Sequence, residues 1–355
     1  MTYSNPTRSL DVGGGRTLET TPVFDSYWRF AAERQALFTR RVQGLPPPWT
    51  ADPIIARHRF TNTYRASDRV SQYLIKHVIY CGDQTAEELF FRIMLFKIFN
   101  RIETWDLLSE TLGELPSWRY FDELRYCRAL DDAMDRGCRL YSAAYIMPSP
   151  KFGASRKHRN HLRLLTQMMR DGAPRAIEAC RSLKEVYETL LAYPSMGPFL
   201  AFQYSVDLNY SELTDFSEMD FVVAGPGARN GIRKCFANTD GLTDAQVISC
   251  VTERADEEFG RLGLSFDKLG GVRPLQLIDC QNLFCETDKY ARVAHPEYVG
   301  TAGRTRIKQR FAARELPLPA QFYPPKWGVP ASLGDVAIQQ PGVMQTALDF
   351  AEEQT

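Results

Sequence analysis

Apolar and aromatic residues recur at helical spacing along most of this 355-residue chain, whereas alternating strand patterns are almost absent. The expected helices span residues 24–42, 68–80, 87–102, 118–140, 157–170, 173–193, 197–208, 244–262 and 274–293. Residues 87–102 are mostly apolar, which is typical of a central core helix. Short strand candidates at residues 143–147 and 220–224 are too few to build a sheet. The pattern therefore predicts an all-α fold.

The two ends of the chain differ from this helical region. Residues 1–20 are polar and glycine-rich and predict a flexible arm, whereas residues 312–355 contain several prolines and predict an extended tail along the surface. Residues 21–311 are then expected to form one helical domain. No segment approaches the ~20 apolar residues of a membrane span, and no apolar signal region is present. We therefore expect a soluble, cytoplasmic protein with no membrane partner.

Charge and cysteine spacing narrow the functional classes. The 43 Lys and Arg residues balance the 43 Asp and Glu residues, so global charge does not favour nucleic acid, although a local basic face suffices for phosphate contacts. The eight cysteines and five histidines show no iron–sulfur or zinc spacing, so we expect reduced core thiols and predict no metal site and no cofactor. No Walker A sequence occurs in these residues, which argues against a P-loop kinase.

Residues 59–71 bring charged and aromatic side chains to the start of an expected helix. Arg65 and Arg69 are four residues apart and would share a helical face. Because guanidinium groups match phosphate oxygens, one interpretation is a polyphosphate clamp; the other is a helix cap with a structural Asp–Arg network. The candidate binding residues are Asn62, Tyr64, Arg65, Asp68 and Arg69.

A tight turn at residues 193–197 joins two expected helices, which is the arrangement of a helix-hairpin-helix element. In such elements, backbone amides and a helix N-terminus hold a DNA phosphate, so Ser195 and Gly197 are candidate DNA contacts. Pro194, Gly197 and Ala201 match the hairpin of helix-hairpin-helix DNA glycosylases, whereas Ser195 departs from it. Phe199 stands where glycosylases with lyase activity have a nucleophilic lysine, so lyase chemistry is not expected.

Those glycosylases also carry an aspartate farther along the chain. Asp220 falls in the corresponding window, with Asp207 and Asp215 as competitors. A helix cap or an ion-pair partner is the structural alternative for Asp220.

Residues 224–234 form a glycine-rich turn that leads into a helix and carries three cations. Exposed backbone amides at Gly225 and Gly227 would form a phosphate nest, supported by Arg229, Arg233 and Lys234. The alternative is a structural turn followed by a cation cluster.

Two further segments carry charges. Residues 281–290 place Gln281, Glu286, Asp288 and Lys289 in an otherwise apolar helix, where they form either a structural network or a group that accepts a proton from an amine. Residues 304–310 are basic, and either contact the DNA backbone through Arg304 and Lys308 or form a solvated face.

Together these segments resemble the thymine-hypermodification family of bacteriophages, whose members have been called alpha-glutamyl/putrescinyl thymine pyrophosphorylases and amino acid:DNA transferases. The resemblance runs from about Phe24 to Phe311, through residues 60–71, residues 196–203 with Asp207, residues 224–228 and residues 285–290. A related helical domain is fused to a P-loop kinase in the 5-hydroxymethyluracil DNA kinases. The missing Walker A sequence favours the stand-alone transferase branch.

The resemblance implies an all-helical, glycosylase-like fold and a substitution on a flipped base in double-stranded DNA. A free amino acid would attack the methylene carbon of 5-(pyrophosphoryloxymethyl)uracil and release pyrophosphate, in the host cytoplasm if a phage encodes the protein. Arg65, Arg69 and Arg229 would stabilise the leaving group, and Gln203 joins the substrate-binding residues. The candidate catalytic residues are Asp220, Glu286, Asp288 and Lys289.

Three alternatives stay open at this point. A divalent metal ion assisting the departure of pyrophosphate is one. The others are a DNA N-glycosylase and a non-catalytic reader of modified thymine in DNA.

Overall fold

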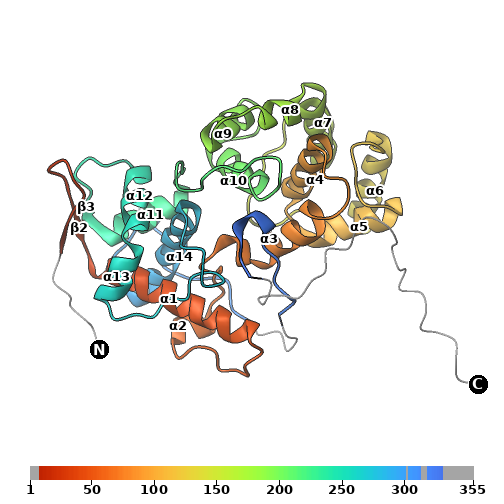
Figure 1. Ribbon diagram of the computed structural model, residues 1–355. Helices are drawn as coiled ribbons and strands as arrows, with labels where there is room; N and C mark the ends of the chain where they lie inside the picture. Colours follow the sequence, from red (N-terminus) through yellow and green to blue (C-terminus); the bar gives the residue numbers. More distant parts are fainter. Residues whose placement is uncertain (1–7, 301–302, 313–317, 331–355) are drawn as a thin grey trace, which may run out of the picture.

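The computed structural model describes residues 8–300, 303–312 and 318–330. Its described part is mostly helical, as predicted, with one small sheet (Figure 1). The α-helices are α1 (Pro22–Val42), α2 (Pro53–Arg57), α3 (Arg69–Tyr73), α4 (Ala86–Phe99), α5 (Ile102–Leu112), α6 (Glu123–Asp135), α7 (Lys157–Arg170), α8 (Ala173–Glu178), α9 (Leu183–Leu191), α10 (Pro198–Leu208), α11 (Pro226–Cys235), α12 (Asp244–Glu253), α13 (Ala255–Arg261) and α14 (Leu277–Ala294). Two 3-10 turns, η1 (Arg65–Ser67) and η3 (Pro325–Trp327), and one π-helical turn, η2 (Leu74–Ile79), complete the helical elements.

The hydrophobic core is continuous through two groups of helices. Helices α4 to α10 lie on one side, and α1 packs with α11 to α14 on the other (Figure 1). As its sequence predicted, α4 is a central core helix that contacts α5, α7, α8 and α10 and buries nearly all of its side chains. It ends at Asn100, whose left-handed backbone terminates the helix. Residues 65–67 contact α14 of the second group, and Arg65 also contacts Gln203 and Asp207 on α10 of the first group, so this junction can hold a site.

Glycines allow α11 and α14 to pack very closely. A Cβ atom at Gly227 would lie 2.3 Å from the Cys285 sulfur, and one at Gly231 would lie 2.0 Å from the Phe284 carbonyl oxygen. At the start of α11, a Cβ at Gly225 would lie 2.7 Å from the Phe199 ring. These glycines therefore serve contact between helices, because any side chain would overlap a neighbour.

Residues 8–20 are folded, whereas the sequence predicted a flexible arm. Strands β1 (Ser9–Asp11) and β2 (Thr17–Thr20) form an antiparallel hairpin, and β2 also pairs with β3 (Phe236–Asn238). Leu10 and Leu18 point into the core and are fully buried. Strands of three or four residues are too short to show an alternating pattern, so the sequence did not reveal them. Residues 1–7 lie outside the described residues.

The proline-rich C-terminal region was predicted to run along the surface, and residues 318–330 are its largest described part. Here Tyr323 is buried and its hydroxyl lies 2.8 Å from the Ser67 hydroxyl. Lys326 donates to the carbonyl oxygens of Ser211 (2.7 Å) and Thr214 (2.5 Å). The segment thus packs against the loops around Arg65, while residues 313–317 and 331–355 lie outside the described part.

Three remaining features bear on function. In the described part of the chain, no helix is long and apolar enough to span a membrane. The eight cysteines are all unpaired. Residues 143–147 and 220–224 form no strand.

Candidate active site

A buried cluster of charges lies where the two groups of helices meet. Arg65 begins η1, Asp207 lies on α10 and Lys97 lies on α4. Asp207 is fully buried and accepts an ion pair from Arg65 at 2.7 Å and another from Lys97 at 3.1 Å. Burial alone would raise the pKa of Asp207, but the two cations outweigh it and hold that pKa below its ordinary value. Burial also lowers the pKa of Lys97 to about 8, although Asp207 opposes the shift.

Polar neighbours occupy most of the remaining donors of Arg65. Its Nε donates to the Gln203 side-chain oxygen at 3.1 Å, and one terminal nitrogen donates to the Tyr210 hydroxyl at 3.1 Å. Gln203 in turn donates to Gln281 at 3.2 Å. Arg65 is 2% exposed, so its guanidinium group is committed to partners within the fold. These contacts take most of the five donors of its guanidinium group, and the role of Arg65 in a pyrophosphate clamp stays a prediction.

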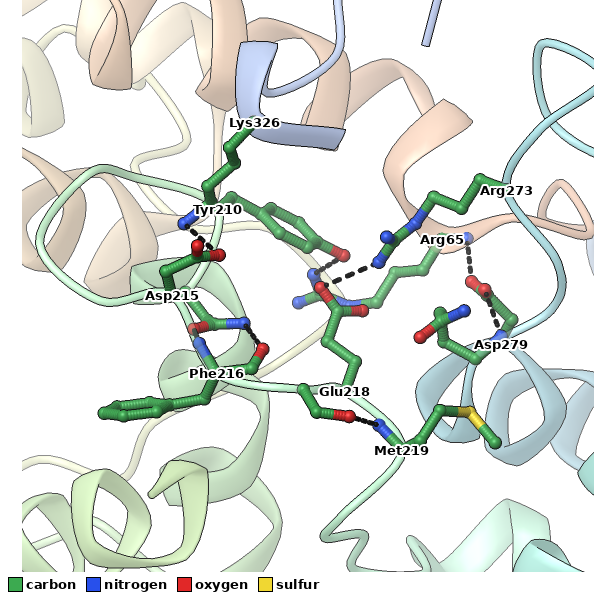
Figure 2. Close-up of polar contacts among 12 residues, drawn as sticks. Arg65, Tyr210, Asp215, Phe216, Glu218, Met219, Arg273, Asp279 and Lys326 are labelled. Atoms are coloured by element: carbon green, nitrogen blue, oxygen red, sulfur yellow. Dashed lines mark hydrogen bonds and ion pairs between the residues drawn. The ribbon is translucent and has the colours of Figure 1, made fainter. Parts of the chain in front are cut away.

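Two more carboxyl groups lie close to Arg65 (Figure 2). Asp279, at the start of α14, accepts a hydrogen bond from the Arg65 backbone N–H at 2.8 Å. Glu218 lies 3.2 Å from Arg273, whose backbone carbonyl accepts a hydrogen bond from Tyr64. Burial raises the pKa of Asp279 to about 6 and that of Glu218 to about 7.

Asp68 lies at the edge of this cluster and is only partly buried. Its carboxylate accepts a hydrogen bond from the Asn62 backbone N–H at 2.8 Å. Burial raises the pKa of Asp68 to about 7, and the nearby charge of Glu286 adds to the shift while that of Arg34 opposes it. A half-buried carboxyl group with a pKa near neutrality has the properties of a general base.

Charged side chains from α1 and α14 surround Asp68 and hold the loop at residues 61–62 in place. Arg34, from α1, donates to the Asn62 side-chain oxygen at 2.8 Å and to the Thr61 carbonyl oxygen at 3.0 Å. Glu286, from α14, accepts a hydrogen bond from the Thr61 backbone N–H and lies 2.7 Å from Lys289. The Lys289 ammonium group also lies 4.6 Å from the centre of the Phe60 ring. The predicted residues Asn62, Asp68, Glu286 and Lys289 are therefore brought together.

Tyr145 covers the charge cluster from the loop between α6 and α7. The Lys97 ammonium group lies 4.7 Å from the centre of its ring. The Phe199 ring stacks nearly parallel to the Tyr145 ring, with centroids 5.8 Å apart. Tyr145 has a φ of 55°, which is a strained backbone conformation for a bulky residue.

Two of the predicted catalytic carboxylates, Asp220 and Asp288, do not lie where they could act as a base in the cluster. Asp220 is exposed, and it is Glu218, two residues earlier, that enters the cluster. The two oxygens of Asp288 are held by Lys234 at 3.0 Å and by Arg292 at 2.5 Å. Asp288 is thus a structural ion-pair partner, and the same contact corrects the prediction that Lys234 binds DNA.

The three arginines of the expected pyrophosphate clamp are not brought together. Whereas Arg65 is buried, Arg69 and Arg229 are about half exposed. Arg69 lies 3.8 Å from Glu103 on α5, and Arg229 lies 3.4 Å from Asp244 on α12. Helices α5 and α12 lie at opposite sides of the molecule (Figure 1). The phosphate nest at Gly225 and Gly227 stays a prediction; a Cβ atom at either glycine would overlap Phe199 or Cys285.

The turn between α9 and α10 lies at the position of the expected hairpin. Ser195, which departs from the glycosylase pattern, has a φ of 64°, the left-handed conformation that glycine favours. Gly197 precedes the first turn of α10, is exposed, and has open space where a Cβ would be. Among the other predicted DNA contacts, Arg233, Arg304 and Lys308 are also exposed. Their role in binding DNA stays a prediction.

Several residues of the cluster were missed from the sequence: Arg34, Lys97, Tyr145, Glu218, Arg273 and Asp279. Lys97 had a readable signal, because a lysine inside a nearly all-apolar helix requires a buried partner. The others had none, since their proximity depends on tertiary contacts across the chain.

The described residues contain no group of three or more histidine, cysteine, aspartate or glutamate side chains placed to hold a metal ion.

Comparison with known proteins assigns the family. The family described as "5-hmdU DNA kinase, helical domain" matches residues 21–300. The chain belongs to this family. It is similar to the "5-hmdU DNA kinase" of Bacillus phage SP10, with 28% identity over 291 residues that cover 76% of this chain and 45% of the relative. The match therefore spans about half the length of the curated relative, and no solved structure matches.

The predicted relation to the 5-hydroxymethyluracil DNA kinases is thus confirmed. The part shared with the 5-hmdU DNA kinase helical domain includes every residue of the Arg65 cluster, Asp68 and the α9–α10 turn. Arg304 and Lys308 lie beyond the matched residues.

Proposed function

We propose that the chain modifies a thymine derivative in DNA, and that it joins a free amino acid to 5-(pyrophosphoryloxymethyl)uracil with release of pyrophosphate. The membership in the 5-hmdU DNA kinase helical-domain family supports the thymine derivative, since the relative is named for 5-hmdU in DNA. The single observation that carries amine transfer is Asp68, a half-buried carboxyl group whose pKa is raised to about 7.

The reaction needs a base with this property. An amino acid is an ammonium ion at neutral pH and cannot attack carbon until it loses a proton. In the proposed step, the Asp68 carboxylate takes that proton, and the amine nitrogen forms a bond to the exocyclic methylene carbon. The bond from that carbon to oxygen breaks, and pyrophosphate leaves with the electron pair. A pKa near 7 keeps a large fraction of Asp68 ionised at neutral pH while leaving it basic enough to accept a proton.

Cations beside Asp68 support the departure of pyrophosphate. Arg34 keeps its charge at neutral pH, because burial lowers its pKa only to about 10. Lys289 lies 2.7 Å from Glu286, which shares the neighbourhood of Asp68. Fixed positive charge next to a developing anion lowers the energy of the transition state. A divalent metal ion brought with the pyrophosphate is compatible with this arrangement.

The α9–α10 turn supports binding of DNA. The left-handed Ser195 and the open Gly197 at the N-terminus of α10 support the interpretation of this turn as a helix-hairpin-helix element. Backbone N–H groups at such a terminus hold a DNA phosphate. We infer a fold like that of the helix-hairpin-helix glycosylases, in which the target base leaves the stack and enters the protein.

A pyrophosphate-release assay tests this function. Duplex DNA carrying the pyrophosphorylated base is incubated with the protein and a mixture of amino acids. Asp68→Asn keeps the acceptor oxygen for the Asn62 N–H and removes only the base, so the rate should fall by about 10²–10⁴. Asp220→Asn is the matched control on an exposed aspartate and should keep the wild-type rate. Equal rates for the two variants would remove Asp68 from the reaction.

A second candidate function is a DNA glycosylase with lyase activity. Phe199 leaves the usual lysine position without an amine, but the Lys97 ammonium group lies 4.7 Å from the centre of the Tyr145 ring, which stacks on Phe199. Its pKa of about 8 makes it a better nucleophile than an ordinary lysine, and Asp207 accompanies it at 3.1 Å.

Borohydride trapping on a duplex with an abasic site separates the candidates. A covalent protein–DNA adduct that Lys97→Arg abolishes would favour the glycosylase. Pyrophosphate release without an adduct would favour the transferase. Binding without either reaction would indicate a reader of modified thymine.

A further inference from the structure

One segment of this chain carries basic residues and no acidic ones. Residues 136–170 contain eight lysines and arginines and no aspartate or glutamate. A stretch of 35 residues would hold about four acidic residues at the average of 43 in 355. The segment comprises the loop between α6 and α7 and all of α7.

Part of this charge is neutralised within the fold. Arg156 and Arg159 pair with Asp131 on α6, and Arg163 lies 3.7 Å from Glu123. By contrast, Arg139 and Lys151 are exposed, and among the described residues neither has an ion-pair partner. These two cations belong to the loop and stand on either side of Tyr145 in the sequence.

The loop between α6 and α7 carries the exposed cations and also contacts the buried cluster through Tyr145. Tyr145 points inward and contacts both Lys97 and the Phe199 ring at the start of α10. The next residue, Ile146, is 60% exposed. Single exposed apolar residues are ordinary, but this one follows a bulky residue held in a left-handed conformation, at a φ of 55°. The strained backbone sets one side chain toward the site and its neighbour toward solvent.

We propose that residues 139–151 form a DNA-binding loop in which Ile146 enters the base stack at the place the target base has left. Apolar wedges of this kind unstack a base step, and flanking cations hold the backbone phosphates. Arg139 and Lys151 supply those cations, and Phe199 places the loop next to the α9–α10 turn that grips DNA in the proposed function. The inference rests on that proposed function for its DNA substrate.

The wedge is tested by fluorescence rather than by product formation. A duplex carries 5-hydroxymethyluracil with 2-aminopurine as the neighbouring base, whose fluorescence rises when the stack opens. Wild-type protein and Val272→Ala, which shortens a 54% exposed valine elsewhere, should give the same rise. Ile146→Ala should lose most of the rise while duplex affinity changes by about threefold or less, and Ile146→Leu should restore it. A full rise with Ile146→Ala would overturn the wedge.

The cations are tested by the salt dependence of binding. Replacing Arg139 and Lys151 with glutamine should reduce the slope of log affinity against log salt by about 2, at 0.9 per phosphate contact. The matched control replaces two exposed cations outside the segment, Arg16 and Arg29, and should leave the slope unchanged. An unchanged slope for the loop variant would overturn the DNA-binding loop. If wild-type protein neither binds the duplex nor raises fluorescence, the proposed function itself has failed and takes this inference with it.

Discussion

Replacing Asp207 with asparagine tests whether the Arg65 cluster is the buried ionic centre of this fold. The change keeps the shape of the side chain but removes the only full negative charge paired with both Arg65 and Lys97 in the described structure, at 2.7 and 3.1 Å. Breaking a buried ion pair by removing one partner costs on the order of 3–5 kcal/mol, because the remaining charge stays desolvated. We expect a loss of that size in the free energy of unfolding near pH 6.

The same variant has a predictable pH dependence. Burial lowers the pKa of Lys97 to about 8, and the charge of Asp207 opposes that shift. Without Asp207, the pKa of Lys97 falls further below its value in the unfolded chain. A group with a lowered folded pKa destabilises the fold while it is charged, and the penalty is relieved as pH rises through that pKa. In the variant, Lys97 begins to lose its proton at a lower pH than in wild type. Between the pKa of Lys97 in the variant and its wild-type pKa of about 8, the loss of stability caused by Asp207→Asn therefore shrinks by about 1.4 kcal/mol per pH unit.

Urea unfolding followed by circular dichroism at about pH 6 and pH 8.5 measures both effects. The matched control is Glu258→Gln, which removes a fully buried carboxylate paired with Arg8 and Arg261. Arginines keep their protons over this range, so its deficit should not change with pH. A loss below about 1 kcal/mol for Asp207→Asn at both pH values, or the same loss at both, would refute the reasoning.

Three further changes test other parts of the account. Gly231→Ala places a Cβ 2.0 Å from a backbone oxygen of α14 and should lower the free energy of unfolding by about 3 kcal/mol. The control Gly260→Ala has open space around the new Cβ and should raise the free energy of unfolding by about 0.5–1 kcal/mol. Equal denaturation midpoints for the two variants would contradict the close packing of α11 against α14. Ser195→Gly should raise stability by up to about 1 kcal/mol, because it relieves a left-handed backbone, and a lower melting temperature would argue against that conformation. Transferase rate should rise with pH through about 7 in wild type and lose that inflection in Asp68→Asn, and a retained inflection would assign it to another group. Because a raised carboxyl pKa favours the protonated folded state, wild-type stability should fall from pH 4 to pH 7 relative to the same variant.

Helix positions were readable from the sequence because periodicity is a local property. The expected helix at 157–170 coincides with α7, and those at 24–42 and 197–208 differ from α1 and α10 by only one or two residues at the start. The segment at 118–140 was too long, since α6 starts only at Glu123, after its cap at Asp122, and ends at Asp135. Helical spacing does not mark such ends unless a cap is recognised.

Only part of the site could be predicted from the sequence, because a charged residue gives the same local pattern whether it faces solvent or another helix. Lys234 was assigned to DNA, yet it lies on the face of α11 that packs against α14. Gly227, Gly231 and Lys234 follow one another at helical spacing, so the glycine face already indicated where the lysine would point. The pairing of Arg65 with Asp207 joins residues 142 positions apart, which no local pattern reveals.

The central claim is that this chain attaches an amine to a modified thymine in DNA, and the mass of the product nucleoside tests it most directly. Duplex DNA containing 5-(pyrophosphoryloxymethyl)uracil is incubated with the protein and amino acids, then digested and examined by mass spectrometry. The account predicts a new nucleoside heavier than 5-hydroxymethyldeoxyuridine by the mass of one amino acid less one water, absent when Asp68→Asn replaces the wild type. Recovery of only unmodified or hydrolysed nucleoside with every amino acid would contradict it.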